Sequence, residues 1–220
     1  INFLFPIGVA IFYGENDVIL PFLIPMITVV VVGVFSIVIG RKQVFRVSIR
    51  GAFAVASCSW IFASLLGAVP LMASGYIPHF ADAYFESVSG FTTTGATILS
   101  EIDSLPRSIN LWRCQMHWLG GMGIVALTVA FLPLLGVGGF QLIKAETTGP
   151  EKGKVTPKIT NTAKALWIIY LVLTLLQTVL LMLSDLDFVD SISIAFATLG
   201  TGGFAAKNAS IGAYNSASVD

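Results

Sequence analysis

The chain has 220 residues, of which 55% are hydrophobic and only 11% are charged, and its mean hydropathy is +0.87. Soluble domains carry about 25% charged residues, so this composition excludes an ordinary soluble domain and indicates a membrane protein. The formal net charge is zero, and without a basic excess we expect no nucleic-acid partner. The two cysteines, Cys58 and Cys114, form neither a disulfide framework nor a metal-ligand motif.

Five apolar segments follow one another along the chain. A helix needs about 20 such residues to cross the hydrocarbon core of a membrane. Residues 1–12 are expected to be the remainder of one span, because the chain opens within an apolar run and shows no signal-peptide pattern. Complete spans are expected over 18–40, 51–75, 111–140 and 165–184. In the first of these, Pro21 and Pro25 are expected near one end.

The connections between the spans differ sharply in charge. The loop over 41–50 has four basic residues and no acid, and the loop over 141–164 has five lysines and two glutamates. Nine acidic residues fall in the other connections. Since Lys and Arg concentrate on the cytoplasmic side of membrane proteins, both basic loops are predicted to be cytoplasmic. The alternation agrees with the number of spans.

Two segments on the predicted outer side are too apolar for solvated loops and too short to cross. They are residues 79–91 and 186–197. A helix of about 12 residues is roughly 18 Å long, which is half of a bilayer. Each has an acid near its start, Asp82 or Asp187, as suits a helix N-terminus. We expect re-entrant half-helices, and the alternative is a pair of helices lying flat at the interface.

A repeated phrase follows the two short segments. GFTTTGAT covers residues 90–97, and FATLGTGGF covers residues 196–204. Shifting the chain by 105 residues aligns four pairs without a gap: Asp82 with Asp187, Phe91 with Phe196, Thr93 with Thr198 and Gly95 with Gly200. An internal repeat of this kind is typical of a transport pathway built around a pseudo-symmetry axis.

Threonine and glycine at membrane depth indicate backbone that lines a polar path, because non-helical backbone is tolerated there only in protein or around water. Glycine adopts positive φ easily, and inward carbonyl oxygens can replace the water shell of a cation. The potassium-channel filter TVGYG shares its Thr, first Gly and last Gly with TLGTG over 198–202. In the first repeat, Ala96 and Thr97 replace the Tyr and Gly of that filter, which predicts a simpler filter.

The strings TTTGAT, TLGTGGF and QMHWLGGMGIVAL resemble the Trk/Ktr/HKT superfamily of potassium transporters over nearly the whole chain. The resemblance implies an all-α polytopic fold with four repeats of M1, pore helix, filter and M2, preceded by extra helices. Residues 1–40 would be the extra helices. The first repeat would cover 51–140, with M1 at 51–75, pore helix at 79–91, filter at 92–97 and M2 at 111–140. The second would cover 165–220 without its M2, with M1 at 165–184, pore helix at 186–197 and filter at 198–203.

The resemblance also implies a site, partners and a location. K+ would bind backbone carbonyls of Thr93, Thr94, Gly95, Ala96, Thr198, Leu199, Gly200 and Thr201, supported by Thr92, Thr97, Gly202 and Gly203. No organic cofactor is expected. The implied partners are a second copy in a homodimer and a cytoplasmic nucleotide-binding regulatory subunit of the TrkA type, with the lysine loop over 144–164 as one contact. The implied location is the plasma membrane, which is the inner membrane of a bacterium.

Other interpretations remain open at this stage. A cation-coupled secondary transporter with broken helices is the alternative function, and an intramembrane enzyme is disfavoured because no polar catalytic set lies in the spans. Glu86 could attract cations at an outer mouth or be solvated. Arg113 is expected to reach the interface, or to pair with Glu86 or Asp103. His79 and His117 are expected to be polar interface residues, and GGMG over 120–123 is expected to pack helices.

Overall fold

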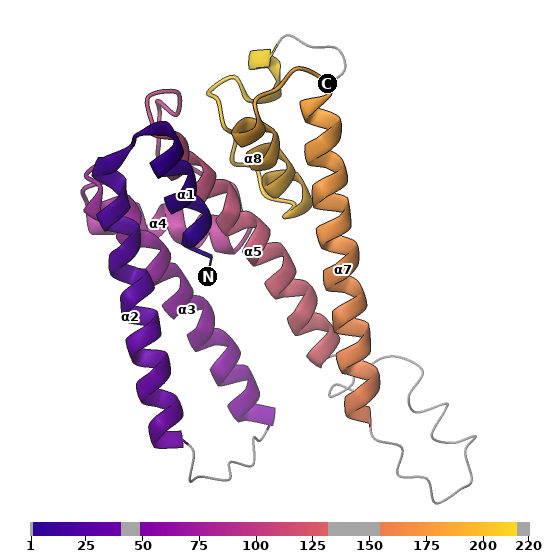
Figure 1. Ribbon diagram of the computed structural model, residues 1–220. Helices are drawn as coiled ribbons and strands as arrows, with labels where there is room; N and C mark the ends of the chain where they lie inside the picture. Colours follow the sequence, from indigo (N-terminus) through magenta and orange to yellow (C-terminus); the bar gives the residue numbers. More distant parts are fainter. Residues whose placement is uncertain (1, 41–48, 132–154, 215–220) are drawn as a thin grey trace, which may run out of the picture.

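The computed structural model describes residues 2–40, 49–131 and 155–214, and within these ranges the chain is helical and contains no strand. The elements are α1 (Leu4–Tyr13), α2 (Asn16–Gly40), α3 (Ile49–Ala73), α4 (Phe80–Phe91), α5 (Arg107–Phe131), α7 (Val155–Met182), α8 (Phe188–Leu199) and the 3-10 helix η1 (Ser210–Tyr214). The predicted all-α fold is confirmed. Figure 1 shows long helices side by side, with the short helices α1, α4 and α8 among them.

Three helices in the described ranges are long and apolar enough to cross a membrane: Asn16–Gly40, Phe53–Ala73 and Asn161–Met182. Their apolar side chains are largely exposed, such as Phe35 at 65% and Leu175 at 61%, as lipid-facing surfaces require. Pro21 and Pro25 lie in the early turns of α2. The chain is therefore a multi-pass membrane protein.

Several helix boundaries differ from the sequence prediction, and two of them fall in the expected loops. Helix α7 begins at Val155 and α3 at Ile49, so the expected cytoplasmic loops over 141–164 and 41–50 are partly helical. Hydropathy detects only the part of a helix that suits hydrocarbon, whereas the hydrogen-bonded helix continues into polar sequence. The expected M2 range 111–140 runs past Phe131, and the part beyond it lies outside the described residues.

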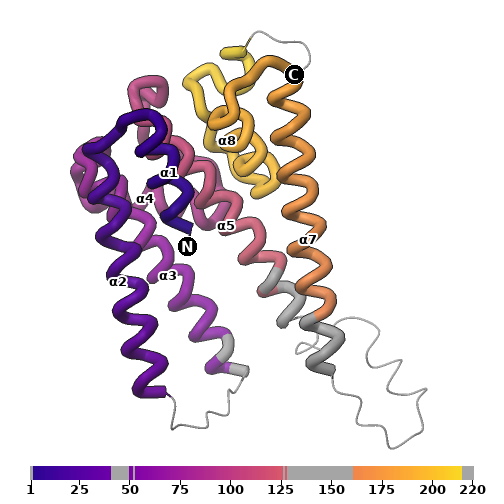
Figure 2. The backbone as a smooth tube through the Cα atoms, in the orientation of Figure 1, coloured from indigo at the N-terminus to yellow at the C-terminus, as the bar shows by residue number. Residues whose placement is uncertain are grey.

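The short helices α4 and α8 begin at the same end of the molecule and run toward its middle (Figures 1 and 2). Helix α4 packs against α3 and α5, and α8 packs between α5 and α7. The side chain of Asp187 caps α8 by accepting from the N–H of Val189 at 3.2 Å. Phe91 and Phe196, near their C-terminal ends, are buried against neighbouring helices, which agrees with the expected re-entrant half-helices.

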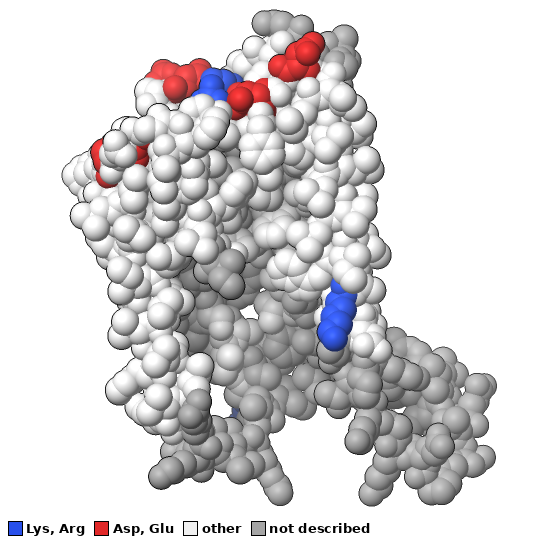
Figure 3. Space-filling view, viewed as in Figure 1, with Lys and Arg blue, Asp and Glu red and all other residues white. Residues whose placement is uncertain are grey.

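Acidic side chains gather at the end where the short helices begin (Figure 3). This end also holds Arg107, whose guanidinium lies 2.6 Å from Asp187 and 4.6 Å over the ring of Tyr13. Glu15 accepts from the N–H groups of Arg107 and Ser108 at 2.7 and 3.1 Å. The connection between α1 and α2 thus caps α5, which fixes the start of the helix that contacts both loops described next.

Candidate ion-conduction site

Each short helix is followed by a Thr/Gly loop, the first over 92–97 and the second over 200–205. The backbone bonds after the two helices are equivalent: Thr92, Thr93 and Thr94 donate to Val88, Gly90 and Ser89, and Gly200, Thr201 and Gly202 donate to Phe196, Thr198 and Ala197. Thr93 and Thr201 both have positive φ, at 56° and 52°, which is rare for β-branched residues. The two loops therefore begin with the same backbone conformation.

This geometry corrects the repeat offset. The helices α4 and α8 and the hydrogen bonds after them are related by 108 residues, so the gapless offset of 105 is wrong. Thr93 corresponds to Thr201 and Gly95 to Gly203, while Thr198 and Leu199 lie in the last turn of α8. The second segment contains two sequences with Thr at the first and Gly at the third position, Thr198–Gly200 and Thr201–Gly203. The gapless alignment selected the first, which still belongs to the end of α8.

The two loops meet at their glycines. A Cβ added to Gly95, whose φ is +74°, would lie 2.9 Å from the Cα of Gly203. The two backbones therefore approach each other closely at these glycines. In the first loop, Thr92 donates to the carbonyl of Val88 at 2.7 Å and its hydroxyl lies 2.8 Å from that of Thr94.

Arg113 and Glu86 form a buried ion pair beside the first loop. The Nη2 and Nε atoms of Arg113 donate to one carboxylate oxygen of Glu86 at 2.6 and 2.8 Å, and both side chains are fully buried. Thr97 also donates to Glu86, at 2.9 Å, and so does the N–H of Ile98, at 3.3 Å. The expectations of an interfacial Arg113 and a solvated or cation-attracting Glu86 are wrong, and the pairing alternative is confirmed.

His117 contacts the end of α4 and the second loop and is fully buried, so its expected place at the interface is wrong. Its Nδ1 lies 2.7 Å from the carbonyl of Gly90, and its Nε2 accepts from the N–H of Phe204 at 3.1 Å. The ring of Phe204 lies between the imidazole, at 4.2 Å, and the Arg113 guanidinium, at 4.3 Å. The order Asn110, Arg113, His117 places these polar side chains on one helix face, a signal that sequence reasoning missed.

The glycines of GGMG bring α5 against the ends of both short helices. A Cβ on Gly120 would overlap the carbonyl of Phe91, and one on Gly121 would lie 2.9 Å from the Cα of Gly200. A Cβ on Gly123 would lie 3.2 Å from the ring of Trp60. The prediction that this motif packs helices is confirmed.

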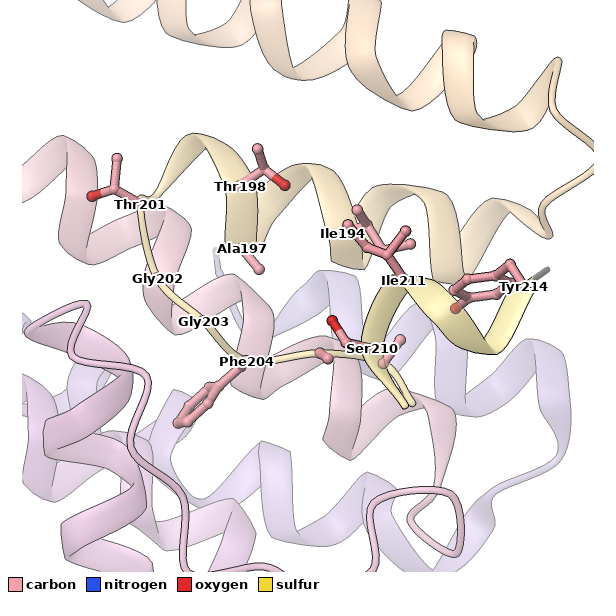
Figure 4. Close-up of a pocket in the computed structure, with 12 residues that line it drawn as sticks. Ile194, Ala197, Thr198, Thr201, Gly202, Gly203, Phe204, Ser210, Ile211 and Tyr214 are labelled. Carbon is pink, nitrogen blue, oxygen red and sulfur yellow. The ribbon is translucent and has the colours of Figure 1, made fainter. Parts of the chain in front are cut away.

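A cavity of about 400 Å3 lies along the second loop. Its walls include Thr198, Thr201, Gly202 and Gly203, with Ile211 and Tyr214 from η1 (Figure 4). Phe204 points away from Ile211 and Tyr214 in this view, toward its contacts on α5. The second loop thus separates an open space from the packed face of α5.

A polytopic helical protein with two inward half-helices and touching loops at their ends belongs to the pore-loop class of membrane proteins. The model of the TrkH family, described as "Cation transport protein", matches residues 22–219. The chain belongs to this family.

The similar proteins include several potassium uptake proteins. The Trk system potassium uptake protein TrkH of Halomonas elongata is 47% identical over 78% of this chain and 36% of its own length. The protein of the same name from Escherichia coli K12 is 44% identical over 82% and 38%. The crystal structure of the potassium transporter TrkH from Vibrio parahaemolyticus superposes with a TM-score of 0.82 at 34% identity, over 99% of this chain and 43% of that one. The chain thus spans less than half the length of these relatives.

Proposed function

We propose that this chain is part of a potassium uptake protein and supplies two of the loops that select K+ through main-chain carbonyl oxygens. The observation that carries the proposal is the backbone approach of Gly95 and Gly203 at the ends of two equivalent half-helices. Carbonyl oxygens held in such loops can replace the hydration shell of K+. The helix C-termini add partial negative charge toward the same place.

The names of the relatives support K+ as the transported ion. The proteins similar to this chain are called Trk system potassium uptake proteins. The relation between the two units also favours a pore over the alternative of an inverted-repeat secondary transporter, because α4 and α8 begin at the same end of the molecule (Figure 1). K+ acts here as the transported substrate, and no organic cofactor is proposed.

The proposed ion ligands follow the structural register. In the first loop they are the carbonyls of Thr93, Thr94, Gly95 and Ala96, as the sequence predicts, with Thr92 and Thr97 as supports. In the second loop the carbonyls equivalent to those of Thr93, Thr94 and Gly95 are those of Thr201, Gly202 and Gly203. The equivalent of Ala96 is Phe204, which we do not propose as a ligand because its carbonyl faces the thiol of Cys114 at 4.0 Å. We assign Thr198, Leu199 and Gly200 a supporting role instead, because Thr198 already accepts from the N–H of Thr201 at 2.9 Å and Leu199 is helical.

Two loops make only part of a ring around an ion. The resemblance implies four repeats, and the relatives are more than twice as long as this chain, so we propose that further repeats complete the pore. We also propose a homodimer and a cytoplasmic nucleotide-binding regulatory subunit as partners. The lysine segment over 144–164, proposed as one contact, lies mostly outside the described residues.

The test uses the complete protein in cells that lack other K+ uptake systems. Gly95→Ala forces a side chain into positive φ and against Gly203, so K+ over Na+ selectivity should fall on the order of tenfold, matching the ~1–2 kcal/mol cost of that conformation. Gly203→Ala should act in the same direction but more weakly, because its Cβ meets only ordinary contact at 3.4 Å. Gly33→Ala on α2 is the control, since nothing lies within 4 Å of its Cβ. Unchanged selectivity in both loop variants would overturn the carbonyl-filter proposal.

A further inference from the structure

We infer that His117 is a positioning residue for ion selectivity, which fixes the direction of the Gly203 carbonyl and the spacing between the two Thr/Gly loops. The inference rests on the proposed function and deepens it. It assigns to one side chain of α5 a role in a filter whose ion contacts come from other segments. Three observations carry it: the hydrogen bonds, the glycine at position 202 and the packing around Phe204.

The hydrogen-bond partners of His117 determine which of its two ring nitrogens carries the proton. The N–H of Phe204 is a donor only, so the Nε2 atom of His117 must accept, at 3.1 Å. The carbonyl of Gly90 is an acceptor only, so Nδ1 carries the hydrogen and donates at 2.7 Å. His117 is therefore neutral, and one ring joins the end of α4 to the second loop.

The bond to Phe204 acts directly on the second loop, and the bond to Gly90 reaches the first loop through a shared carbonyl. The Gly90 carbonyl also accepts from the N–H of Thr93 at 3.1 Å, and Thr93 is the residue with positive φ. In the second loop, the N–H of Phe204 belongs to the peptide unit that contains the Gly203 carbonyl. Because the two groups of a trans peptide point in opposite directions, holding this N–H toward α5 directs the Gly203 carbonyl away from α5.

The surroundings are shaped for this ring. A Cβ on Gly202 would overlap the imidazole of His117, so glycine at 202 leaves the space that the ring occupies. The Phe204 ring, which is 4% exposed, packs between His117 and Arg113 and so also holds the loop to α5. Asn110, one turn before Arg113 on α5, donates to the carbonyl of Ala206 at 2.7 Å. The whole second loop is thus fixed to one face of α5.

Three substitutions separate the two hydrogen bonds. His117→Leu removes both. His117→Asn keeps an amide near the place of Nδ1 and so retains a donor for Gly90, whereas His117→Gln reaches the place of Nε2 and retains an acceptor for Phe204. The matched control is Gln115→Leu on the same helix, because Gln115 is also buried, at 4% exposure, and donates only to the carbonyl of Asn2.

The measurement is the ratio of initial K+ to Na+ flux into proteoliposomes that contain the complete protein. We expect this ratio to fall roughly fivefold in His117→Asn and His117→Gln, and on the order of tenfold or more in His117→Leu, as expected for one and two lost hydrogen bonds. Gln115→Leu should have the same K+ to Na+ flux ratio as the unsubstituted protein. If His117→Leu is not recovered in folded form, the Asn and Gln variants carry the test by themselves.

Two results would overturn the inference. One is a K+ to Na+ flux ratio equal to that of the unsubstituted protein in all recovered His117 variants. The other is an equal fall of this ratio in the His117 variants and in Gln115→Leu. Gly95→Ala and Gly203→Ala, measured in parallel, distinguish a failure of the His117 role from a failure of the carbonyl filter. A lowered ratio in these glycine variants with an unchanged ratio in the His117 variants rejects only the role of His117, whereas an unchanged ratio in both Gly95→Ala and Gly203→Ala rejects the carbonyl filter itself.

Discussion

Arg113 and Glu86 form a 2.6 Å ion pair with both side chains fully buried, whereas Arg107 and Asp187 form a pair of the same length with side chains 43% and 44% exposed. The chain therefore contains a natural comparison between two charge pairs that differ mainly in burial. The buried pair also holds the first Thr/Gly loop, because Thr97 and Ile98 donate to the same carboxylate.

Removing one partner of the buried pair should destabilise the protein strongly. Arg113→Met leaves the Glu86 carboxylate buried without its counter-charge, and we expect the free energy of unfolding to fall by about 3–5 kcal/mol. Arg107→Met should cost only about 0.2–1 kcal/mol, because solvent screens an exposed pair. Thermal unfolding in detergent measures both, and equal losses in the two variants would contradict the structural role of the buried pair.

The double variant Glu86→Leu with Arg113→Met gives a second check. It removes both charges, so no ion remains buried alone, and it should be more stable than Arg113→Met. A double variant less stable than either single one would show that the hydrogen bonds to the loop outweigh the desolvated charge.

Gly120→Ala should separate α5 from α4. The added methyl group would overlap the carbonyl oxygen of Phe91, and overpacking of this kind costs about 1–3 kcal/mol or more. Gly33→Ala should instead raise the free energy of unfolding, by roughly 0.5–1 kcal/mol, because alanine favours helix more than glycine. The added Cβ would lie in open space within α2. The yield of monodisperse protein after detergent extraction compares the two.

Glu15 should stabilise the start of α5 from outside that helix. Its carboxylate accepts from two backbone N–H groups and from the hydroxyl of Ser108, at 2.5 Å. Replacing a helix cap typically costs about 0.5–2 kcal/mol, so Glu15→Ala should lower the unfolding temperature, and Glu15→Gln, which keeps an acceptor but no charge, should lower it less. A Gln variant as unstable as the Ala variant would argue against capping by this side chain.

Tyr76 should remain protonated at a pH where an ordinary tyrosine ionises. Its pKa is raised above 10.0, first by burial and then by the hydrogen bond it donates to Asp17 at 3.1 Å. Because the folded pKa is raised, its contribution to stability is present below the ordinary pKa and is lost as pH rises through the folded value. The difference in near-ultraviolet phenolate absorbance between the parent protein and Tyr76→Phe follows this titration, and ionisation at the ordinary pKa would contradict it.

The sequence determined the class of fold without help from the structure. Uninterrupted apolar runs specify membrane helices because unpaired backbone cannot be left in hydrocarbon, and the two short runs with their Thr/Gly phrases specify where the chain turns back. These signals are local, since each depends on neighbouring residues alone. The all-helical fold and the packing role of the GGMG glycines followed from them.

Only the tertiary structure decided the register of the second loop and the roles of Arg113, Glu86 and His117. A residue pattern cannot show at which residue α8 ends, so the gapless alignment paired Gly95 with Gly200. In the structure, Gly95 corresponds to Gly203 and also lies against it. Polar residues within an apolar helix are ambiguous in the same way. Whether Arg113 reaches water or a buried carboxylate depends on which segment lies beside it, and the approach of helices distant in sequence settles that.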